Sequence, residues 1–485
     1  MIKLNKKEYL DKLHACWIGK NIGGTLGAPY EGKQEFVDVK GFVTEPGEPL
    51  PNDDLDLQLV WLCALEEQGV HNFGTTTLAE YWVDWISPHW NEYGIAKRNL
   101  QMGILPPMSG EVDNEKWKTS NGAWIRSEIW AGLAPGLPDI AVKYATMDAM
   151  VDHGTSEGSC AEIFTAALQS YAYIRSDIRE LINAALKKIP EDSMTSRTVR
   201  LVMECYDKGL DYKEAREKVI ELNKSLGWFQ APGNLGFVTI GLIYGEGDFK
   251  KSMLYAVSCG DDTDCTAATV GATLGIVGGT AGIPDDWKKQ VGDRIYTVSI
   301  NGSYAYRMPK TCTALTDRVL ALVPDVMKAN RVKFEFTDGE SEYGENDLKK
   351  YTKLTSADLL DRMPYSYDIK PSNLFSVRVE LDNSPRVKAG DKRLVTLTFT
   401  SATRNAVPRM LYIKLITPDN LTVENYEKTL ALEYPQPEHG IWGVSKTSFE
   451  VTVGERLETV DRLYAEITCT TIPYPVIVPV VFLGR

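Results

Sequence analysis

The sequence predicts a multidomain protein in which an all-α bundle is followed by an all-β antiparallel sandwich. Apolar residues recur with the period of an α-helix up to about residue 330, and with a period of two after about residue 373. The chain has 485 residues, whereas single hydrophobic cores stop growing at roughly 250–300 residues. We therefore expect a helical domain over residues 1–335, a linker over 336–372 and a sandwich over 373–485.

The helical part contains several segments with one apolar face. Such faces run through residues 57–64, 161–172 and 315–323, and Gly69 follows the first of them as a stop signal. Asp211 and Glu214 have the spacing of a capping box, which predicts a helix that ends at Gly227. No series of strand–helix–strand units interrupts this pattern, so the domain is predicted to be a helix bundle.

The C-terminal part alternates apolar and polar residues in short runs. The runs are 375–381, 395–399, 411–415 and 449–453, and turn-forming residues separate them. This pattern is typical of an antiparallel sandwich. The intervening residues 337–350 are polar and charged, which indicates a linker or a surface excursion.

Composition excludes some classes of function. The formal net charge of −13 argues against a protein that binds the nucleic-acid backbone, which requires a basic surface. The eight cysteines form no C-x-x-C pair, and the N-terminal residues contain no apolar signal core, so we expect a cytoplasmic protein. Residues 266–283 lack charge but are rich in Thr, Gly and Ala, which favours a buried central helix over a membrane span.

Two carboxylate clusters each precede an apolar helix. The first is Asn52-Asp53-Asp54-Leu55-Asp56 and the second is Asp261-Asp262-Thr263-Asp264. A single Asp at such a position caps the helix, but three in four positions repel one another unless a cation lies among them. Oxygen ligands of this kind favour magnesium, manganese or calcium over zinc.

The helix after the second cluster has small residues along one side, namely Ala267, Ala268, Gly271, Ala272 and Gly275. Small side chains allow helix backbones to approach closely, although glycine within a helix costs about 1 kcal/mol. This cost is tolerable at the centre of a bundle, where the helix would form a rigid support for the carboxylates.

The order of these motifs resembles the ADP-ribosylglycohydrolase family, and within it the dinitrogenase reductase-activating glycohydrolases. The resemblance covers about residues 10–300. Asn52-Asp53-Asp54-Leu55 is similar to the family's Thr-Asp-Asp-Thr motif, and residues 260–265 to its Gly-Gly-Asp-Thr-Asp-Thr motif. The family's glycine motif and later Glu resemble Gly19, Gly23, Gly27 and Glu31. Its Gly-Asn-Gly loop resembles residues 120–122, with Arg126 beyond them, and its helix-start His resembles His153.

The resemblance implies two Mg²⁺ or Mn²⁺ ions between the carboxylate clusters of an all-α bundle. Asp53, Asp54, Asp262 and Asp264 would be the principal ligands, with Asn52 and Cys265 at two further ligand positions. The implied catalytic residues are Glu31, Asp54 and Asp262, with Glu31 near the scissile bond. Asn121, Gly122 and His153 would contact the substrate.

The sequence also departs from the family's pattern. Asn52 and Cys265 each replace a liganding Thr, Gly24 stands where the family often has Asp, and Asp56 and Asp261 are additional acids that could compensate. Trp124 and Trp130 make the stretch after Asn121 bulkier than usual, which indicates a remodelled pocket.

Three functions remain open. The first is hydrolysis of an ADP-ribosyl or related ribosyl N- or O-glycosidic bond, in a small molecule or on a protein. The second is a glycosidase or nucleosidase acting on another small sugar conjugate, and the third is a catalytically silent ligand-binding relative.

Several other residues have alternative interpretations. His153 is as well explained as a helix cap or a partner of a site residue as by substrate contact. Trp82, Trp85 and Trp90 are more typical of a core than of a stacking platform, and Gly94, Gly103, Pro106 and Pro107 indicate a loop that could border the site.

Overall fold

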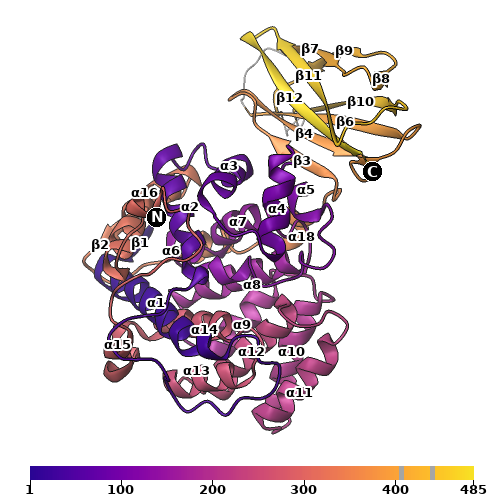
Figure 1. Cartoon of the computed structure of the whole chain (residues 1–485). Coiled ribbons are helices and arrows are strands. Elements are labelled where there is room, and N and C mark those ends of the chain that lie inside the picture. Colours follow the sequence, from indigo (N-terminus) through magenta and orange to yellow (C-terminus); the bar gives the residue numbers. More distant parts are fainter. Residues whose placement is uncertain (403–408, 437–442, 485) are drawn as a thin grey trace. The chain divides into compact units, whose positions relative to one another are not determined.

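The computed structural model describes residues 1–402, 409–436 and 443–484. The chain divides into two compact units (Figure 1). The helical unit comprises Met1–Gly94 and Asn114–Asp361, and the sandwich unit comprises Ile95–Asp113 and Arg362–Arg485. The predicted order of an α-helical part followed by a β part is confirmed.

The helical unit consists mainly of α-helices, which are between 5 and 22 residues long. Its helices are α1 (Lys6–Gly27), α2 (Asp53–Gln68), α3 (Thr75–Trp85), α6 (Glu128–Leu133), α7 (Pro138–Ala149), α8 (Glu157–Ala172), α9 (Ile178–Leu186), α10 (Met194–Asp207), α11 (Tyr212–Asn223), α12 (Ala231–Tyr244), α13 (Phe249–Ser258), α14 (Thr263–Gly278), α15 (Asp285–Val291), α16 (Cys312–Ala329), α17 (Glu345–Lys350) and α18 (Ser356–Leu360). Helix α4 (Asn91–Gln101) begins in this unit and continues into the other.

The expected helices form at the segments with an apolar face. Asp211 and Glu214 make the predicted capping box of α11, but this helix ends at Asn223, and Gly227 lies in the following turn at φ 85°. Among the described residues, none of the helices is both long enough and apolar enough to cross a bilayer. Residues 266–283 instead contribute most of α14, which is buried along nearly its whole length.

Helices α1 and α14 lie side by side in the helical unit and approach closely (Figure 1). Gly19, Gly23 and Gly27 recur every four residues, and so lie on one face of α1. A Cβ atom on any of them would come within 2.4 Å of the backbone of α14. The row of small residues in both helices therefore permits a backbone contact that larger side chains would prevent.

The segment predicted as a linker packs against the helical unit over most of its length. Strand β2 (Phe334–Thr337) pairs in parallel with β1 (Ile2–Asn5), a small sheet that the helical pattern did not indicate. The Tyr343 hydroxyl donates a hydrogen bond to the Pro135 carbonyl at 3.2 Å, and Lys188 Nζ donates to the Leu354 carbonyl at 2.8 Å.

The sandwich unit consists of two five-stranded sheets. One has the order β3-β4-β6-β10-β8 and is antiparallel throughout; the other has the order β5-β12-β11-β7-β9, in which only the short β5–β12 pair is parallel. The strands are β3 (Ser366–Ile369), β4 (Phe375–Leu381), β5 (Arg386–Val387), β6 (Lys392–Ser401), β7 (Arg409–Ile416), β8 (Leu421–Val423), β9 (Glu427–Leu432), β10 (Val444–Val453), β11 (Val460–Cys469) and β12 (Ile472–Gly484).

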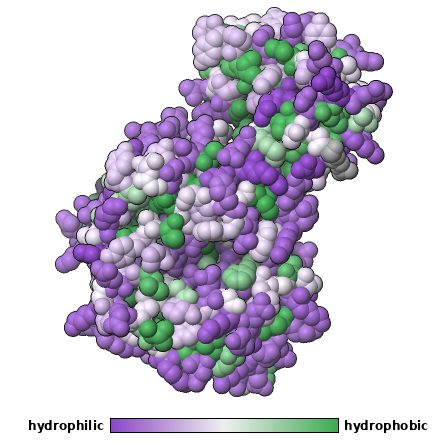
Figure 2. All heavy atoms as spheres, viewed as in Figure 1, coloured by the Kyte–Doolittle hydropathy of each residue, from purple (hydrophilic) through white to green (hydrophobic). Residues whose placement is uncertain are grey.

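An earlier part of the chain completes the sandwich core. Ile104, Met108 and Val112, from the segment that includes α5 (Met108–Glu111), are almost fully buried in one cluster with the inward-facing residues of the strands. Alternation is strict in β4, where every second residue is buried, whereas β12 has a run of consecutive buried residues near its end. In the view of Figure 2, hydrophilic side chains predominate on the surface and apolar residues form small, scattered groups.

Candidate metal and substrate site

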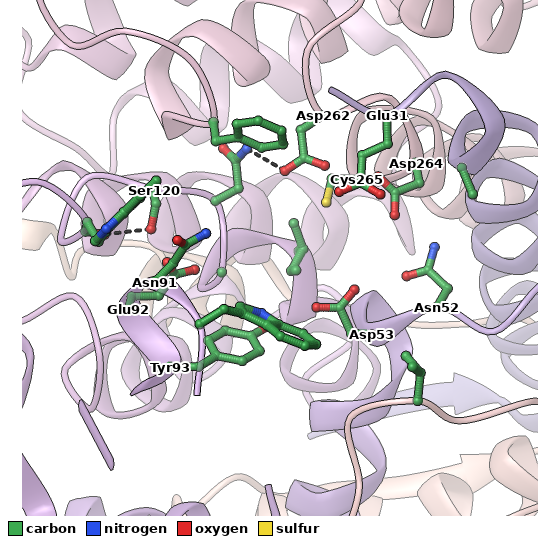
Figure 3. Close-up of a pocket in the computed structure, with 18 of the residues that line it drawn as sticks. Glu31, Asn52, Asp53, Asn91, Glu92, Tyr93, Ser120, Asp262, Asp264 and Cys265 are labelled. Atoms are coloured by element: carbon green, nitrogen blue, oxygen red, sulfur yellow. Dashed lines mark hydrogen bonds between the residues drawn. The ribbon is translucent and has the colours of Figure 1, made fainter. Parts of the chain in front are cut away.

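The two acidic clusters converge because their helices begin side by side in the bundle. Asn52 caps α2 by accepting a hydrogen bond from the Asp54 backbone N–H at 2.7 Å, which places Asp53 and Asp54 in the first turn. Asp262 and Asp264 lie at the start of α14. Glu31 follows the end of α1 and points toward the same place (Figure 3).

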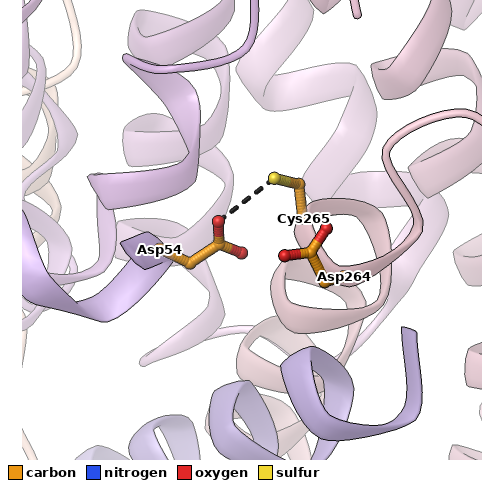
Figure 4. A group of neighbouring side chains, drawn as sticks. All are labelled: Asp54, Asp264 and Cys265. Atoms are coloured by element: carbon orange, nitrogen blue, oxygen red, sulfur yellow. Dashed lines mark hydrogen bonds between the residues drawn. The ribbon is translucent and has the colours of Figure 1, made fainter. Parts of the chain in front are cut away.

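These acids form two overlapping groups that could each hold a cation. Asp54, Asp264 and Cys265 make the first, and Glu31, Asp262 and Asp264 make the second. Within each group the candidate ligand atoms lie within 4.8 Å of one another, and Asp264 belongs to both (Figure 4 shows the first group). The structure thus brings together five of the predicted ligand and catalytic residues, with Asp53 beside them on the cleft wall.

The electrostatics of the site fit a divalent cation. The neighbouring Asp264 and burial raise the pKa of Glu31 to about 7, and burial together with Asp264 raises the pKa of Asp53 to about 7. Asp54 Oδ2 and Asp264 Oδ1 are buried without a hydrogen-bond partner. Buried polar atoms normally have a partner, and a cation would supply one to both oxygens.

The nearby cationic side chain of Lys20 does not neutralise these carboxylates. Lys20 is buried, and its Nζ lies 3.1 Å from a carboxylate oxygen of Glu128 and donates to the Ile125 carbonyl at 2.6 Å. Its charge is therefore balanced mainly by Glu128.

Two departures from the family's pattern explain each other. A Cβ atom on Gly24 would lie 2.1 Å from Nδ2 of Asn52. Any larger residue at position 24 would displace the Asn52 side chain that caps α2. The glycine at position 24 therefore accommodates the asparagine at position 52.

The additional acids Asp56 and Asp261 do not join the cluster, so the suggestion that they compensate for the altered ligands is wrong. Asp56 Oδ2 accepts hydrogen bonds from the backbone N–H groups of Val298 and Ser299, each at 2.6 Å. Asp261 accepts from the Phe229 N–H at 3.0 Å and from the side-chain amide of Asn234 at 2.8 Å. Both acids hold neighbouring loops in place.

The acids line one wall of a cleft of about 600 Å³. This volume is within the range of small-molecule sites. The lining residues are Ala28, Glu31, Pro51, Asn52, Asp53, Trp90, Asn91, Glu92, Tyr93, Trp117, Ser120, Asn121, Gly122, Ile125, Phe229, Asp262, Asp264, Cys265 and Val298.

Asn121 connects the loop at residues 120–122 to the acids. Its side-chain amide donates to Asp262 Oδ2 at 2.6 Å, and its carbonyl oxygen accepts from the indole N–H of Trp124 at 3.0 Å. Trp124 is fully buried, and so is Trp130, which donates to Asp148 Oδ2 at 2.9 Å. Trp124 therefore fixes the orientation of Asn121, and neither indole lines the cleft.

His153 lies behind the cleft wall. It is fully buried, with Nδ1 2.9 Å from Asp152 and Nε2 3.3 Å from the Ser120 hydroxyl. Asp152 also pairs with Arg126 at 2.7 Å, and Arg126 pairs with Asp148 at 2.9 Å. In this arrangement Ser120 faces the cleft, and His153 supports it from behind.

Glu92, which no motif in the sequence indicated, is buried and lines the cleft. Burial raises its pKa, and its Oε2 atom has no hydrogen-bond partner. A Cβ atom on Gly122 would lie 2.3 Å from Glu92 Oε1, so the glycine allows this carboxyl group to approach the loop. The available signal was an acidic residue after Trp90, in a stretch assigned to core and loop.

Trp90 lines the cleft and is 51% exposed, whereas Trp82 and Trp85 are buried as expected. Of the stretch expected as a loop, Gly94 lies within helix α4, whereas Gly103, Pro106 and Pro107 lie between α4 and α5 as expected. Only residues 90–93 of this stretch line the cleft.

Known proteins resemble this chain over most of its helical unit. A sequence model of the ADP-ribosylglycohydrolase family matches residues 5–323. An uncharacterized protein of Archaeoglobus fulgidus is 24% identical in an alignment of 310 residues that covers 59% of this chain and 92% of that protein. A solved chain described as an ADP-ribosylglycohydrolase-related protein complex is 21% identical, with a TM-score of 0.44, over 67% of this chain and 99% of its own length.

The family match spans nearly all of the helical unit, including both acidic clusters and the loop at Asn121. The chain therefore belongs to the ADP-ribosylglycohydrolase family and is a hydrolase that acts on glycosyl bonds.

Proposed function

We propose that this protein cleaves an ADP-ribosyl or related ribosyl N- or O-glycosidic bond at a site that holds two divalent cations, magnesium or manganese. Asp53, Asp54, Asp262 and Asp264 are the principal ligands, with Asn52 and Cys265 at the two remaining positions. The observation that carries the proposal is the pair of acid groups that share Asp264 and leave buried oxygens without partners.

Bound cations at such a site orient sugar hydroxyls and polarise a water molecule. The residues of this chain supply the rest of the chemistry. Glu31 lies at the cleft next to Asp262 and Asp264, where a carboxyl group can take or give a proton beside the reacting bond. Asn121 fixes Asp262 through its amide hydrogen bond, and an acid so oriented can serve as a ligand or a base.

Glu92 offers a second titratable group at the cleft, outside the two acid groups. Burial favours its neutral form, which can donate a hydrogen bond or a proton to a leaving group. Cleavage at an anomeric carbon develops positive charge on the sugar and negative charge on the departing atom, so a proton donor there lowers the barrier.

One observation favours the alternative of a glycosidase or nucleosidase with an uncharged substrate. Among the residues that line the cleft, all of which are described, there is no Lys or Arg. A diphosphate would depend on the cations and on backbone N–H groups for its charge balance. The half-exposed Trp90 offers a sugar or base an apolar surface.

A hydrolysis panel separates these alternatives. The protein, loaded with Mg²⁺ or Mn²⁺, is given ADP-ribosylated protein, ADP-ribosylated small acceptors, nucleosides and 4-nitrophenyl ribofuranosides, and free ADP-ribose is tested as a competitor. Release of ADP-ribose, with inhibition by the free compound, supports the first proposal. Cleavage of simpler ribosides that ADP-ribose does not inhibit favours the alternative. Failure to cleave every compound, with binding retained, would leave a ligand-binding protein.

A further inference from the structure

The two groups of candidate ligands share Asp264, and they differ in the element of one ligand atom. The group of Glu31, Asp262 and Asp264 offers only carboxylate oxygens, whereas the group of Asp54, Asp264 and Cys265 includes a sulfur atom (Figure 4). Cys265 lies in the first turn of α14 and lines the cleft, which none of the other seven cysteines does. This sulfur atom distinguishes the metal preference of the two positions.

The contacts of Cys265 are those of a ligand position rather than of a packed core thiol. Its Sγ lies 3.1 Å from Asp54 Oδ1, to which it donates a hydrogen bond. The thiol therefore satisfies only one oxygen of the group, while Asp54 Oδ2 and Asp264 Oδ1 remain without a partner. These two acids are 1% and 7% exposed, so their unpartnered oxygens are not explained by contact with bulk water.

The separations also suit a single ion. Metal–ligand bonds to oxygen and sulfur are about 2.0–2.3 Å long, so ligand atoms around one ion lie roughly 3–4.6 Å apart. The candidate atoms of Asp54, Asp264 and Cys265 lie within 4.8 Å of one another. A small inward movement would bring all three to bonding distance.

The chemistry of the donors decides which ion is favoured. Thiolate ligands favour zinc and similar ions, whereas carboxylate and water favour magnesium, calcium and manganese. A hydroxyl in place of the thiol would leave an all-oxygen set. Cys265 in place of the family's Thr therefore changes which ions the site prefers, and not only its affinity for them.

We propose that Asp54, Asp264 and Cys265 form a position for a thiophilic divalent cation of the zinc class, next to an all-oxygen position for magnesium or manganese. This inference rests on the proposed function, because it assumes that the acids hold cations, and it assigns a zinc-class ion to one of the two positions given there to magnesium or manganese. On binding, the Cys265 S–H bond breaks, its proton passes to solvent, and the thiolate replaces a water molecule on the ion; no electron is transferred.

Cobalt is a suitable probe because a thiolate bound to Co²⁺ gives a charge-transfer absorption band in the near ultraviolet, which oxygen ligands do not. The metal-free full-length protein is titrated with CoCl₂, and binding is measured in parallel by equilibrium dialysis. The wild-type protein should develop the band as cobalt binds. Cys265→Ser should bind cobalt without the band, and the control Cys160→Ser, at a buried cysteine outside the cleft, should retain it.

Competition between ions gives a second readout. Calorimetry should show that Cys265→Ser binds zinc roughly tenfold or more weakly than the wild type. Removing even a residue that only hydrogen-bonds to a metal ligand typically costs this much affinity. Magnesium affinity should change little. Zinc titrations in buffers of different ionisation enthalpy should count about one fewer proton released by the variant than by the wild-type protein, because a coordinating thiol is deprotonated.

The wild-type spectrum decides the question even if the variant does not fold. Stoichiometric cobalt binding without a charge-transfer band would overturn the proposal and leave the general metal site intact. If neither cobalt, zinc, magnesium nor manganese binds to the wild-type protein, this proposal and the proposed metal-dependent function both fail.

Discussion

We predict that Gly271→Ala destabilises the protein, because it places a methyl group in the close contact between α1 and α14. A Cβ atom at position 271 would lie 2.2 Å from the Gly19 carbonyl oxygen, whereas ordinary contacts begin at 3.4 Å. The obstacle is backbone, which cannot move aside by changing a rotamer. The two helices must therefore separate by roughly 1 Å, at a centre where interiors are close-packed.

Two opposing effects determine how much the free energy of unfolding of Gly271→Ala falls. Overpacking a core costs about 1–3 kcal/mol, and a backbone clash belongs at the upper end of this range. Replacing glycine by alanine within a helix gains about 1 kcal/mol. The net free energy of unfolding should fall by about 2 kcal/mol, which lowers the melting temperature of a unit of this size by about 4 °C.

The same helix provides a matched control. Gly278 is the last residue of α14, and a Cβ atom there would meet nothing within 4 Å. Gly278→Ala should therefore leave stability unchanged or raise it by up to about 1 kcal/mol. Differential scanning calorimetry measures both variants, and magnesium titration measures whether the cluster at the start of α14 is disturbed. A Gly271→Ala protein as stable as the wild type, with unchanged metal affinity, would refute this account of the helix contact.

Four further outcomes are expected. Asp262→Asn should leave the metal-free protein at least as stable as the wild type, because burial and Asp264 already raise the pKa of Asp262. The variant should lose the rise in melting temperature that Mg²⁺ or Mn²⁺ gives the wild type. Unfolding of the metal-free variant would contradict this. The melting temperature of the metal-free wild-type protein should fall as pH rises from 5 to 8. Glu31 and Asp53 have pKa values of about 7 in the folded protein, against 4.5 and 3.8 ordinarily, so the folded state holds more protons than the unfolded chain in this range. A melting temperature that does not depend on pH would contradict this. Glu92→Gln should lower kcat on a glycoside with a poor leaving group by about 10²-fold or more while sparing a 4-nitrophenyl glycoside, and equal losses on both would indicate a structural role instead. A fragment ending at Asp361 should be less soluble than the same fragment carrying Ile104→Ser, Met108→Ser and Val112→Thr, because these residues lose their apolar partners; sedimentation of the two expressed fragments provides the comparison.

Much of the fold was predictable because local patterns agree with it. The small residues of α14 indicated a close helix contact, and the structure pairs them with the glycines of α1. Strict alternation in β4 predicted its buried face. The parallel pairing of β1 with β2 was not predictable, because it joins residues more than 300 positions apart and leaves no periodic signal.

The site was predictable in its acids and less so in the groups around them. Motif order indicated that Asp54, Asp262 and Asp264 would meet. Asp56 lies outside the acid cluster because it accepts hydrogen bonds from the backbone N–H groups of residues 298 and 299, and the sequence around Asp56 does not indicate these partners. Glu92 reaches the cleft because Gly122 leaves room for it, a steric condition between two segments that only the three-dimensional structure discloses.

The contribution of Ile104, Met108 and Val112 to the sandwich core has a consequence for synthesis of the protein. These residues leave the ribosome long before strand β12, which ends at Gly484. At about 5–20 residues per second, the delay is tens of seconds. During this time the apolar side chains of these three residues lack their strand partners, so the sandwich unit can complete its core only after its last strand has been synthesised.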